Sequence, residues 1–504
     1  MPAGRVAIDA VLGPVPGPVP GPVPGPVLVS VIQRQKTMKK LIALLLLLLP
    51  LAAHAADFTG AGLAPAWAIP FAGLLLSIAI VPLFAPHFWH AHFGKVAAIW
   101  TLALLVPLAQ HFGVETAGQT LVHALLEEYL PFIILLAALY TVAGGICVHG
   151  HLHGSPRLNT GLLALGTVLA SIMGTTGAAM LLIRPLIRAN EHRRDLVHIV
   201  VFFIFLVANA GGALSPLGDP PLFLGFLNGV SFFWTTQHLL LPTLFVCGVL
   251  LALFYLVDTL LLRRHPAPES KAAALKPTRI TLDGKVNLIL LLAILLIVLA
   301  SGLWRPGIEF EIAGTHVALQ NALREVLLLV VMGVSLKLTP HSARLGNAFN
   351  WAPIAEVAKL FAAIFITIAP VIAILRAGES GAFAAVVKLV EDPHGQPVVP
   401  MYFWATGLLS SFLDNAPTYL VFFNSAGGHA DTLMTAGAGT LAAISAGAVF
   451  MGGNSYIGNA PNFMVKSIAE ARGVRMPSFF GYLLWSGGIL IPVFLLTTVI
   501  FFRG

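Results

Sequence analysis

Long hydrophobic runs, separated by short polar stretches, occupy the chain from Ala66 onward. Each run approaches the roughly 20 residues that a membrane-spanning helix requires. The pattern predicts an all-α polytopic membrane protein with about ten transmembrane helices. The predicted spans are residues 66–84, 95–112, 129–148, 196–214, 237–262, 286–303, 320–338, 355–377, 437–453 and 479–502.

Two further hydrophobic stretches, residues 159–187 and 400–424, are interrupted near the middle by polar residues. Each stretch is predicted to form a re-entrant hairpin, in which two half-helices meet at a polar tip, because exposed backbone at membrane depth must be buried in protein or line a wet cavity. A single kinked helix that crosses the whole membrane is the alternative. The two tips read Gly174-Thr175-Thr176-Gly177 and Asp414-Asn415-Ala416-Pro417.

Two predicted spans also run into breaks at mid-membrane. Residues 212–221 contain three prolines, which cannot continue an ordinary helix because proline lacks an N–H donor and clashes with the preceding turn. Residues 452–461 repeat this segment 240 residues later, with Asn459 in place of Asp219. Seven of the twenty positions from 204 to 223 match at that offset, and the hairpin tips keep the same offset. Broken helices at corresponding places in two halves are typical of the binding site of a secondary transporter.

The distribution of basic residues favours the hairpins over kinked spans. If the chain starts outside and each hairpin returns to its own side, eighteen lysines and arginines fall inside and five outside. Cytoplasmic loops carry such an excess of basic residues. The hairpins then enter from opposite sides with five crossings between them, so the two halves are predicted to form an inverted repeat. The five outside residues are Arg305, Arg324, Arg376, Lys388 and Arg503.

The predicted organisation has five parts. Residues 1–37 form a low-complexity Gly/Pro/Val leader that we expect not to be translated. Residues 38–55 have the basic start, short apolar core and A-x-A ending of a signal peptide, for which a retained first helix is the alternative. The first transporter half is residues 56–262 and the second is residues 286–504. A cytoplasmic linker, residues 263–285, joins them.

Composition supports the membrane class. The chain of 504 residues is 58% hydrophobic and only 10% charged, and its mean hydropathy is +0.90. The pI near 9.5 is explained by basic residues at cytoplasmic helix ends, so no nucleic-acid partner is expected. The two cysteines, Cys147 and Cys247, lie in apolar runs and offer no disulfide framework or metal motif.

Polar residues at the four breaks are the candidate site. Asp219 and Asp414 are carboxylates at membrane depth, which are costly and by default mark an ion or proton path. Helix capping is the alternative interpretation, since these residues precede predicted half-helices, but it explains Asn and Thr better than the aspartates. Asp219 before Pro220 reads as an N-cap. The neutral residues expected to supply ligands or hold the backbone open are Asn415, Asn454, Ser455, Asn459, Thr175, Thr176 and Ser215.

Other polar residues are expected to lie outside the site. The cytoplasmic clusters His87/His90/His92 and His149/His151/His153 are interpreted mainly as solvated loops, with pH sensing and metal binding as alternatives. Charges at predicted helix ends are expected to reach the membrane interface and to lie outside the site. These charges are Glu127, Glu128, Asp258, Arg324 and Glu325.

Two motifs resemble a known family. The segments 410–418 (Ser-Ser-Phe-Leu-Asp-Asn-Ala-Pro-Thr) and 458–462 (Gly-Asn-Ala-Pro-Asn) are similar to motifs of the NhaD-type sodium/proton antiporters and of related citrate-transporter-like proteins of the ion transporter superfamily. The resemblance covers residues 60–504 and implies a homodimer with a scaffold part and a moving transport part that contains the hairpins. Relatives carry sodium, citrate, dicarboxylates or arsenite. The tips at 174–176 and 414–416 depart from the Ser-Asn-Thr tips of the dicarboxylate carriers, which argues against carboxylate recognition in their manner.

The leading hypothesis is a secondary transporter that exchanges Na+ or Li+ for H+, with Asp414 and Asp219 as the shared carboxylates. The alternative is a cation- or proton-coupled carrier of citrate or another organic anion, held by half-helix N–H groups. An intramembrane aspartyl protease is disfavoured, because residues 216–219 lack the first glycine of a Gly-x-Gly-Asp signature. We therefore expect no enzyme and no cofactor, and a multi-pass protein of the inner (plasma) membrane that forms homodimers.

Overall fold

The computed structural model describes residues 59–150, 152–266 and 281–503. All of them belong to one compact unit, His54–Gly504. The predicted leader and signal peptide, and most of the predicted linker, lie outside the described residues. Around the predicted linker, one helix ends at Arg264 and the next begins at Val286.

Nine helices in the described part of the chain are long and apolar enough to cross a membrane, which confirms an all-α polytopic membrane protein. The remaining predicted span, residues 437–453, is only a 14-residue helix, because the helix stops at the break that begins at Gly452. The nine candidate spans are Pro65–Phe84, Pro86–Phe112, Val114–Ala143, Val197–Leu214, Trp234–Arg264, Val286–Leu303, Leu319–Leu338, Ala352–Arg376 and Phe479–Phe501.

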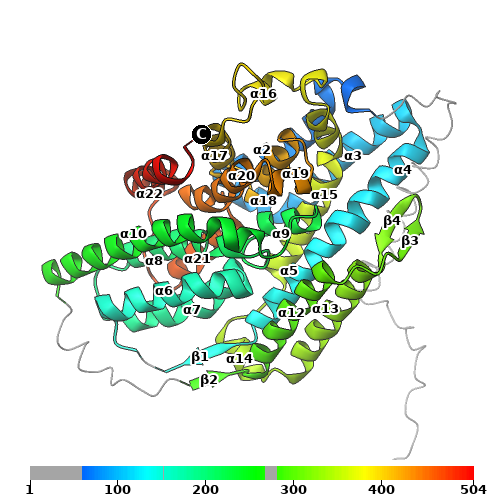
Figure 1. Ribbon diagram of the computed structural model, residues 1–504. Helices are drawn as coiled ribbons and strands as arrows, with labels where there is room; N and C mark the ends of the chain where they lie inside the picture. The colour runs from blue at the N-terminus through cyan, green and yellow to red at the C-terminus, as the bar shows by residue number, and fades with distance from the viewer. Residues whose placement is uncertain (1–58, 151, 267–280, 504) are drawn as a thin grey trace, which may run out of the picture. The chain divides into compact units, whose positions relative to one another are not determined.

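The first half contains α2 (Ile69–Phe84), α3 (Pro86–Phe112), α4 (Val114–His123), the π-helical turn η3 (Ala124–Tyr129), α5 (Leu130–Ala143), α6 (Pro156–Met173), α7 (Thr175–Asn190), α8 (Val197–Leu206), the 3-10 turn η4 (Ala210–Leu214), α9 (Pro220–Leu227) and α10 (Trp234–Arg264). Short 3-10 turns η1 (Gly60–Gly62) and η2 (Pro65–Ala68) precede α2. Figure 1 shows α6 and α7 lying alongside each other and beside α8 and α10.

The second half contains α12 (Val286–Leu303), α13 (Leu319–Leu338), α14 (His341–Gly346), α15 (Ala352–Arg376), η5 (Gly378–Ser380), α16 (Ala384–Lys388), α17 (Val399–Ser410), α18 (Asn415–Ser425), α19 (Ala430–Met434), α20 (Ala438–Met451), η6 (Gly452–Asn454), α21 (Ala460–Ala471) and α22 (Phe479–Phe501). Helices α12 and α13 pack on α5 of the first half, while α18 packs on α9. The two halves of the sequence are therefore interleaved in space.

Two small antiparallel sheets were not predicted. Strand β1 (Cys147–His149) pairs with β2 (Thr281–Asp283), and the hairpin β3 (Glu309–Ile312) pairs with β4 (Thr315–Ala318). The two-residue turn of the hairpin uses Ala313 and Gly314, both at positive φ, as a tight hairpin turn requires. These strands are only three or four residues long, too short to give a clear alternating pattern in the sequence.

The stretch 159–187 folds back on itself, as the hairpin interpretation predicts. Asn159 near the start of α6 and Asn190 at the end of α7 exchange amide hydrogen bonds of 2.9 and 2.8 Å. A single kinked helix would separate two residues 31 positions apart by roughly 45 Å. The break itself is Gly174, whose φ of 81° is accessible to glycine at little cost.

The second hairpin has the same form. The rings of Tyr402 in α17 and Phe422 in α18 lie 6.4 Å apart, so the two arms are antiparallel. The hairpin also packs against α20, which approaches α17 closely: a Cβ on Gly447 would lie 2.5 Å from the carbonyl oxygen of Phe403. Small residues at such a contact let two helix backbones approach, as in other membrane helix pairs.

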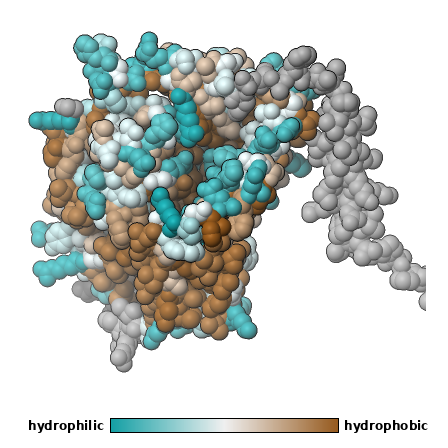
Figure 2. Space-filling view, turned by 45° about the vertical axis from the view of Figure 1, so that its right-hand side comes forward, coloured by the Kyte–Doolittle hydropathy of each residue, from teal (hydrophilic) through white to brown (hydrophobic). Residues whose placement is uncertain are grey.

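Burial separates lipid-facing helices from inner ones. Residues 199–206 of α8 and the two residues that follow are at most 1% exposed, so this helix lies inside the protein. In contrast, α12 and α13 expose large apolar side chains such as Ile289 at 70% and Val326 at 56%. Figure 2 shows a broad hydrophobic area on one face with hydrophilic residues above it. An apolar exterior of this kind suits a bilayer rather than water.

Two predicted loop or helix-end positions are in fact helical. His87, His90 and His92 lie in the first turns of α3, which begins nine residues before the predicted span at 95. Glu127 and Glu128 lie in η3, inside the continuous span Val114–Ala143, rather than at a helix end. Both predictions were wrong because polar residues in a helical turn weaken the hydrophobic signal without ending the helix.

Two helix-end charges expected at the membrane interface are buried instead. Asp258 in α10 is 0% exposed and Arg324 in α13 is 2% exposed. Arg324 pairs with its neighbour Glu325 at 2.8 Å, and Asp258 pairs with Arg193 at 2.7 Å. The interface prediction fails because each charge has an ionic partner within the protein, and a buried charge is tolerated when it is paired.

Candidate functional site

Both broken helices are built in the same way. After α8 the chain forms η4, passes through an extended segment, and restarts at Pro220; after α20 it forms η6 and restarts at Ala460. In the first half the Ser215 hydroxyl donates to the carbonyl of Ser171 on the hairpin. In the second half the Ser455 hydroxyl donates to the carbonyl of Ser411 at 2.5 Å. The same contact thus recurs at the 240-residue offset that the sequence predicts.

In each break, one glycine lets two backbone segments approach each other closely. A Cβ on Gly218 would lie 2.1 Å from the carbonyl oxygen of Gly212, and one on Gly458 would lie 2.6 Å from that of Gly452. Such distances leave no room for any side chain. The matching glycines in the two halves are therefore required by close backbone approach, and not by turn geometry.

Asp219 lies where the breaks and the two hairpin tips meet. Its Oδ1 accepts hydrogen bonds from the Thr175 hydroxyl at 3.0 Å and from the Asn459 amide at 3.2 Å. Its Oδ2 accepts one from the Asn415 amide. These donors come from the first hairpin, the second break and the second hairpin. The Asp219 side chain therefore contacts residues from both halves of the chain. The carboxylate is 2% exposed.

The capping interpretation fails for most of these residues. Asp219 and Asn459 occupy N-cap positions before prolines, yet neither side chain caps its helix. The N-cap of α7 is Gly174, so neither Thr175 nor Thr176 caps it, and Asn415 is the first helical residue of α18. The side chains of Thr175, Asn415 and Asn459 instead all donate to that of Asp219.

Asp414 is the exception, because it does cap its helix. Its Oδ1 accepts from the backbone N–H of Ala416 at 3.1 Å. The carboxylate also lines a cavity of about 70 Å³ together with Thr176 and Asn459. No hydrogen bond joins Asp414 to Asp219 within the described residues.

The predicted neutral residues divide into two groups. The hydroxyls of Ser215 and Ser455 join the extended segments to the hairpins and accept hydrogen bonds from nearby N–H groups. Asn454 donates to the hydroxyl of Ser411 at 2.9 Å. In contrast, the buried amide oxygens of Asn415 and Asn454 have no hydrogen-bond partner in the described structure. Unsatisfied buried oxygens are unusual, and a water molecule or an ion is one way to satisfy them.

Two asparagines of the site were missed. Asn209 donates to the side-chain oxygen of Asn462 at 2.7 Å, joining the first break to the second. Asn462 in turn donates to the carbonyls of Gly452 and Ser455, at 2.8 Å each. Asn209 had a usable signal, since it is a single amide inside the apolar run 199–214.

Two small cavities adjoin this polar centre and helix α5. The first, of about 70 Å³, is lined by Phe132, Tyr140 and Phe361 as well as by Asp414. The second, of about 40 Å³, reaches Asp219 and Thr175. Each has room for about one or two water molecules. No basic side chain lines either cavity among the described residues.

Comparison with known proteins agrees with a transport site. The model of a family described as "Putative citrate transport" matches residues 60–502. No curated protein matches the chain significantly. The family match spans almost every described residue, including both hairpins and both breaks. The chain therefore belongs to this family of transport proteins and is a multi-pass membrane protein.

Proposed function

We propose that the protein exchanges Na+ or Li+ for H+ across the membrane, with Asp219 and Asp414 as the exchanging carboxylates. In each cycle a carboxylic acid releases its proton as a cation binds, and regains a proton after the cation leaves on the other side. One observation supports this proposal above all. Asp219 is buried among neutral donors, with no basic residue bonded to it in the described part of the chain. An uncompensated charge in the membrane must be neutralised by a proton or a cation.

The surroundings of the carboxylates are rich in oxygen atoms. The unpartnered amide oxygens of Asn415 and Asn454 and the hydroxyl of Thr176 are neutral ligand candidates near the tips. Hard cations prefer such oxygen ligands. We propose that these groups replace part of the hydration shell of the cation, while Ser215 and Ser455 hold the unwound backbone open. Asn209 and Asn462 fix the two breaks against each other.

A coupled carrier of citrate or another organic anion is the second candidate, and the description of the family favours it. Two features of the site argue against it. The carboxylate of Asp414 already occupies the N-terminal end of α18, where a substrate carboxylate would bind N–H groups. The cavities of about 70 and 40 Å³ are far below the roughly 300 Å³ of small-molecule pockets.

Transport in proteoliposomes separates the two candidates. Vesicles with an imposed pH gradient are challenged in turn with Na+, Li+, K+, citrate and succinate. Collapse of the gradient by Na+ or Li+ alone supports the antiporter. Collapse that requires citrate or succinate overturns it in favour of the anion carrier.

The proposal includes an inverted arrangement of the halves in the inner (plasma) membrane. Arg157, at the start of α6, and His429, after α18, are both exposed. A cysteine replacing Arg157 should then react with an impermeant reagent only from the cytoplasm, and one replacing His429 only from the outside. Labelling of both from one side would contradict the inversion. We also expect a homodimer, which light scattering of the purified protein measures.

A further inference from the structure

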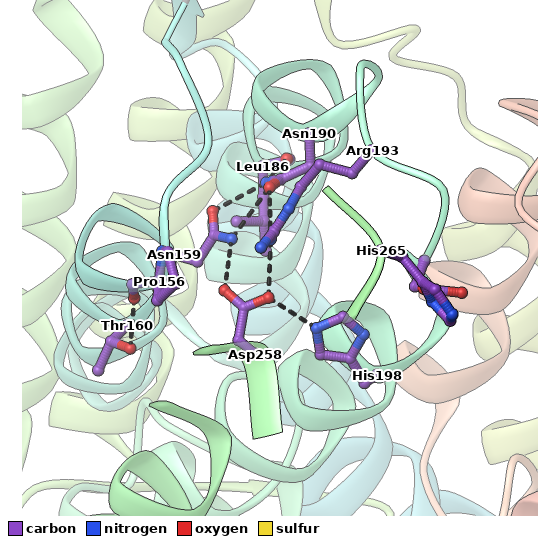
Figure 3. Close-up of polar contacts among 10 residues, drawn as sticks. Pro156, Asn159, Thr160, Leu186, Asn190, Arg193, His198, Asp258 and His265 are labelled. Atoms are coloured by element: carbon purple, nitrogen blue, oxygen red, sulfur yellow. Dashed lines mark hydrogen bonds and ion pairs between the residues drawn. The ribbon is translucent and has the colours of Figure 1, made fainter. Parts of the chain in front are cut away.

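A second buried polar cluster lies at the base of the first hairpin, away from the carboxylates of the site. Asp258 of α10 accepts from Arg193 at 2.7 Å and from His198 at 2.8 Å on one oxygen, and from Asn159 at 3.0 Å on the other. Figure 3 shows these side chains converging from α6, α8, α10 and the segment after α7. Asn190 of α7 completes the cluster, since it accepts from Arg193 at 3.1 Å.

The cluster is closed to solvent. Asp258, Asn159 and Asn190 are 0% exposed, and His198 and Arg193 are 2% and 7% exposed. Both arms of the hairpin thus bond, directly or through Arg193, to a carboxylate on α10. The hairpin is joined in this way to α8, which leads into the first break, and to α10.

The second hairpin shows that the fold does not need this cluster. The positions 240 residues later are Val399, Ala430, Leu433, Ala438 and Thr498. Of these, Thr498 alone is polar, and it accepts a hydrogen bond from Trp404 at 3.0 Å. Aromatic side chains such as Phe403 and Phe502 pack at the base of the second hairpin, with ring centroids 4.8 Å apart.

Stability alone is a poor explanation for the charged cluster. Desolvation of a buried ion pair offsets much of its attraction, and apolar replacement is often neutral or stabilising. Breaking such a pair, however, leaves a buried charge without compensation and is strongly unfavourable. A cluster of this kind therefore responds sharply to any change in its total charge, and it contains a titratable imidazole.

We infer that Asp258, Arg193 and His198 form a proton-sensitive latch that positions the first hairpin against α8 and α10. With neutral His198, which donates from Nε2, the charges of Arg193 and Asp258 cancel and the latch is closed. A proton on His198 places a second cation on the oxygen that already accepts from Arg193. The excess buried charge is relieved when Arg193, which lies between α7 and α8 next to the exposed Arg194, moves out, and its bond to Asn190 is then lost.

The other groups around His198 leave the imidazole as the sensor. From the elements packed against it, Asp258 and Arg193 are the charged groups, while Asn159 and Asn190 are neutral amides. Phe254 of α10 covers the ring at 6.1 Å. The nearby His192 stacks on His153 at 4.3 Å. Burial, His153 and Arg193 lower the pKa of His192.

The exposure of a cysteine at the base of the hairpin tests the latch without any transport assay. Ala189 of α7 is 1% exposed, so a cysteine in its place reacts only when the base opens. Ala189→Cys is made in a chain whose Cys147 and Cys247 are replaced by alanine, held in nanodiscs. Reaction with a maleimide is timed at about pH 5.5 and pH 8.5, on either side of the ordinary histidine pKa. Each rate is divided by the rate of the same cysteine in a His198→Gln protein at the same pH. This ratio cancels the effect of pH on the reactivity of the thiol itself.

The latch predicts a different pH response for each variant. With native His198 the ratio is near one at high pH and rises about tenfold at low pH, where histidine is charged. Arg193→Gln should reverse the trend, because Asp258 then lacks a cation until His198 is protonated. Thr498→Val, at the position equivalent to Asp258, should leave the response unchanged. An unchanged ratio between the two pH values, or an Arg193→Gln protein that still opens in acid, overturns the latch. The antiporter could fail its own vesicle test while this result stands.

Discussion

Asp219 and Asp414 occupy similar places in the sequence, each before a half-helix that carries an early proline, yet the structure uses them differently. Asp219 binds Thr175, Asn415 and Asn459, which come from three separate segments. Asp414 caps its own helix through Ala416 and faces a small cavity. The comparison teaches that a local helix-start pattern does not decide where a side chain points. That direction depends on which donors the other half of the chain brings near.

The largest effect is expected for Asp219→Asn. This change keeps the shape but removes the charge that three donors surround, so cation binding and exchange should fall by more than about 100-fold, or about 2.7 kcal/mol. Na+-driven collapse of a pH gradient in proteoliposomes measures it, with insertion and monodispersity as controls. An exchange rate within a factor of about two of the native rate would contradict the central role of Asp219.

Asp414→Asn should have a smaller effect. Asn caps a helix as well as Asp does, so α18 should form normally, but the cavity loses its charge. We expect exchange to fall by about 30-fold, or about 2 kcal/mol. Asp414→Glu, which keeps the charge at a displaced position, should retain partial activity with an altered apparent affinity for Na+. A fully active Asp414→Asn protein would leave Asp414 as a cap alone.

Asn415→Ala tests the hydrogen bond that Asn415, the residue after Asp414, donates to Asp219. It removes one donor from Asp219, and a hydrogen bond to a charged group contributes about 1.5–3 kcal/mol. The apparent affinity for Na+ should change by about tenfold. Asn424→Ala is the matched comparison, because Asn424 of the same helix donates to the carbonyl of Leu420 and does not contact Asp219. Equal shifts for the two variants would show that the contact with Asp219 is unimportant.

The smallest effects should be those of Ser215→Ala and Ser455→Ala. Each hydroxyl donates to a hairpin carbonyl in its own half, and losing such a bond costs about 1 kcal/mol. The two variants should lower thermal stability by similar amounts and leave the Na+ affinity nearly unchanged. A large change in affinity for one serine only would identify that hydroxyl as a cation ligand, and would break the symmetry between the halves.

Much of the fold could be predicted because its causes are local. Apolar runs must span a bilayer, and proline and glycine at residues 212–221 and 452–461 must break helices. The hairpin interpretation followed from charge and is borne out by the contact between Asn159 and Asn190. The helical positions of His87 and Glu128 could not be predicted by the same means, since polar residues within a helix resemble a loop when only hydrophobicity is considered.

The sequence by itself determined that this protein is a membrane protein with two related halves, because hydrophobic length and helix breakers act on the segment that carries them. It also placed carboxylates and amides at the breaks. Only the tertiary structure decided that Asp219 turns away from its own helix toward Asn415 and Asn459, and that Asn209 reaches Asn462. It alone paired Asp258 with Arg193 and His198. These contacts join residues 60 to 253 positions apart, and a buried polar group finds whichever partner packing supplies.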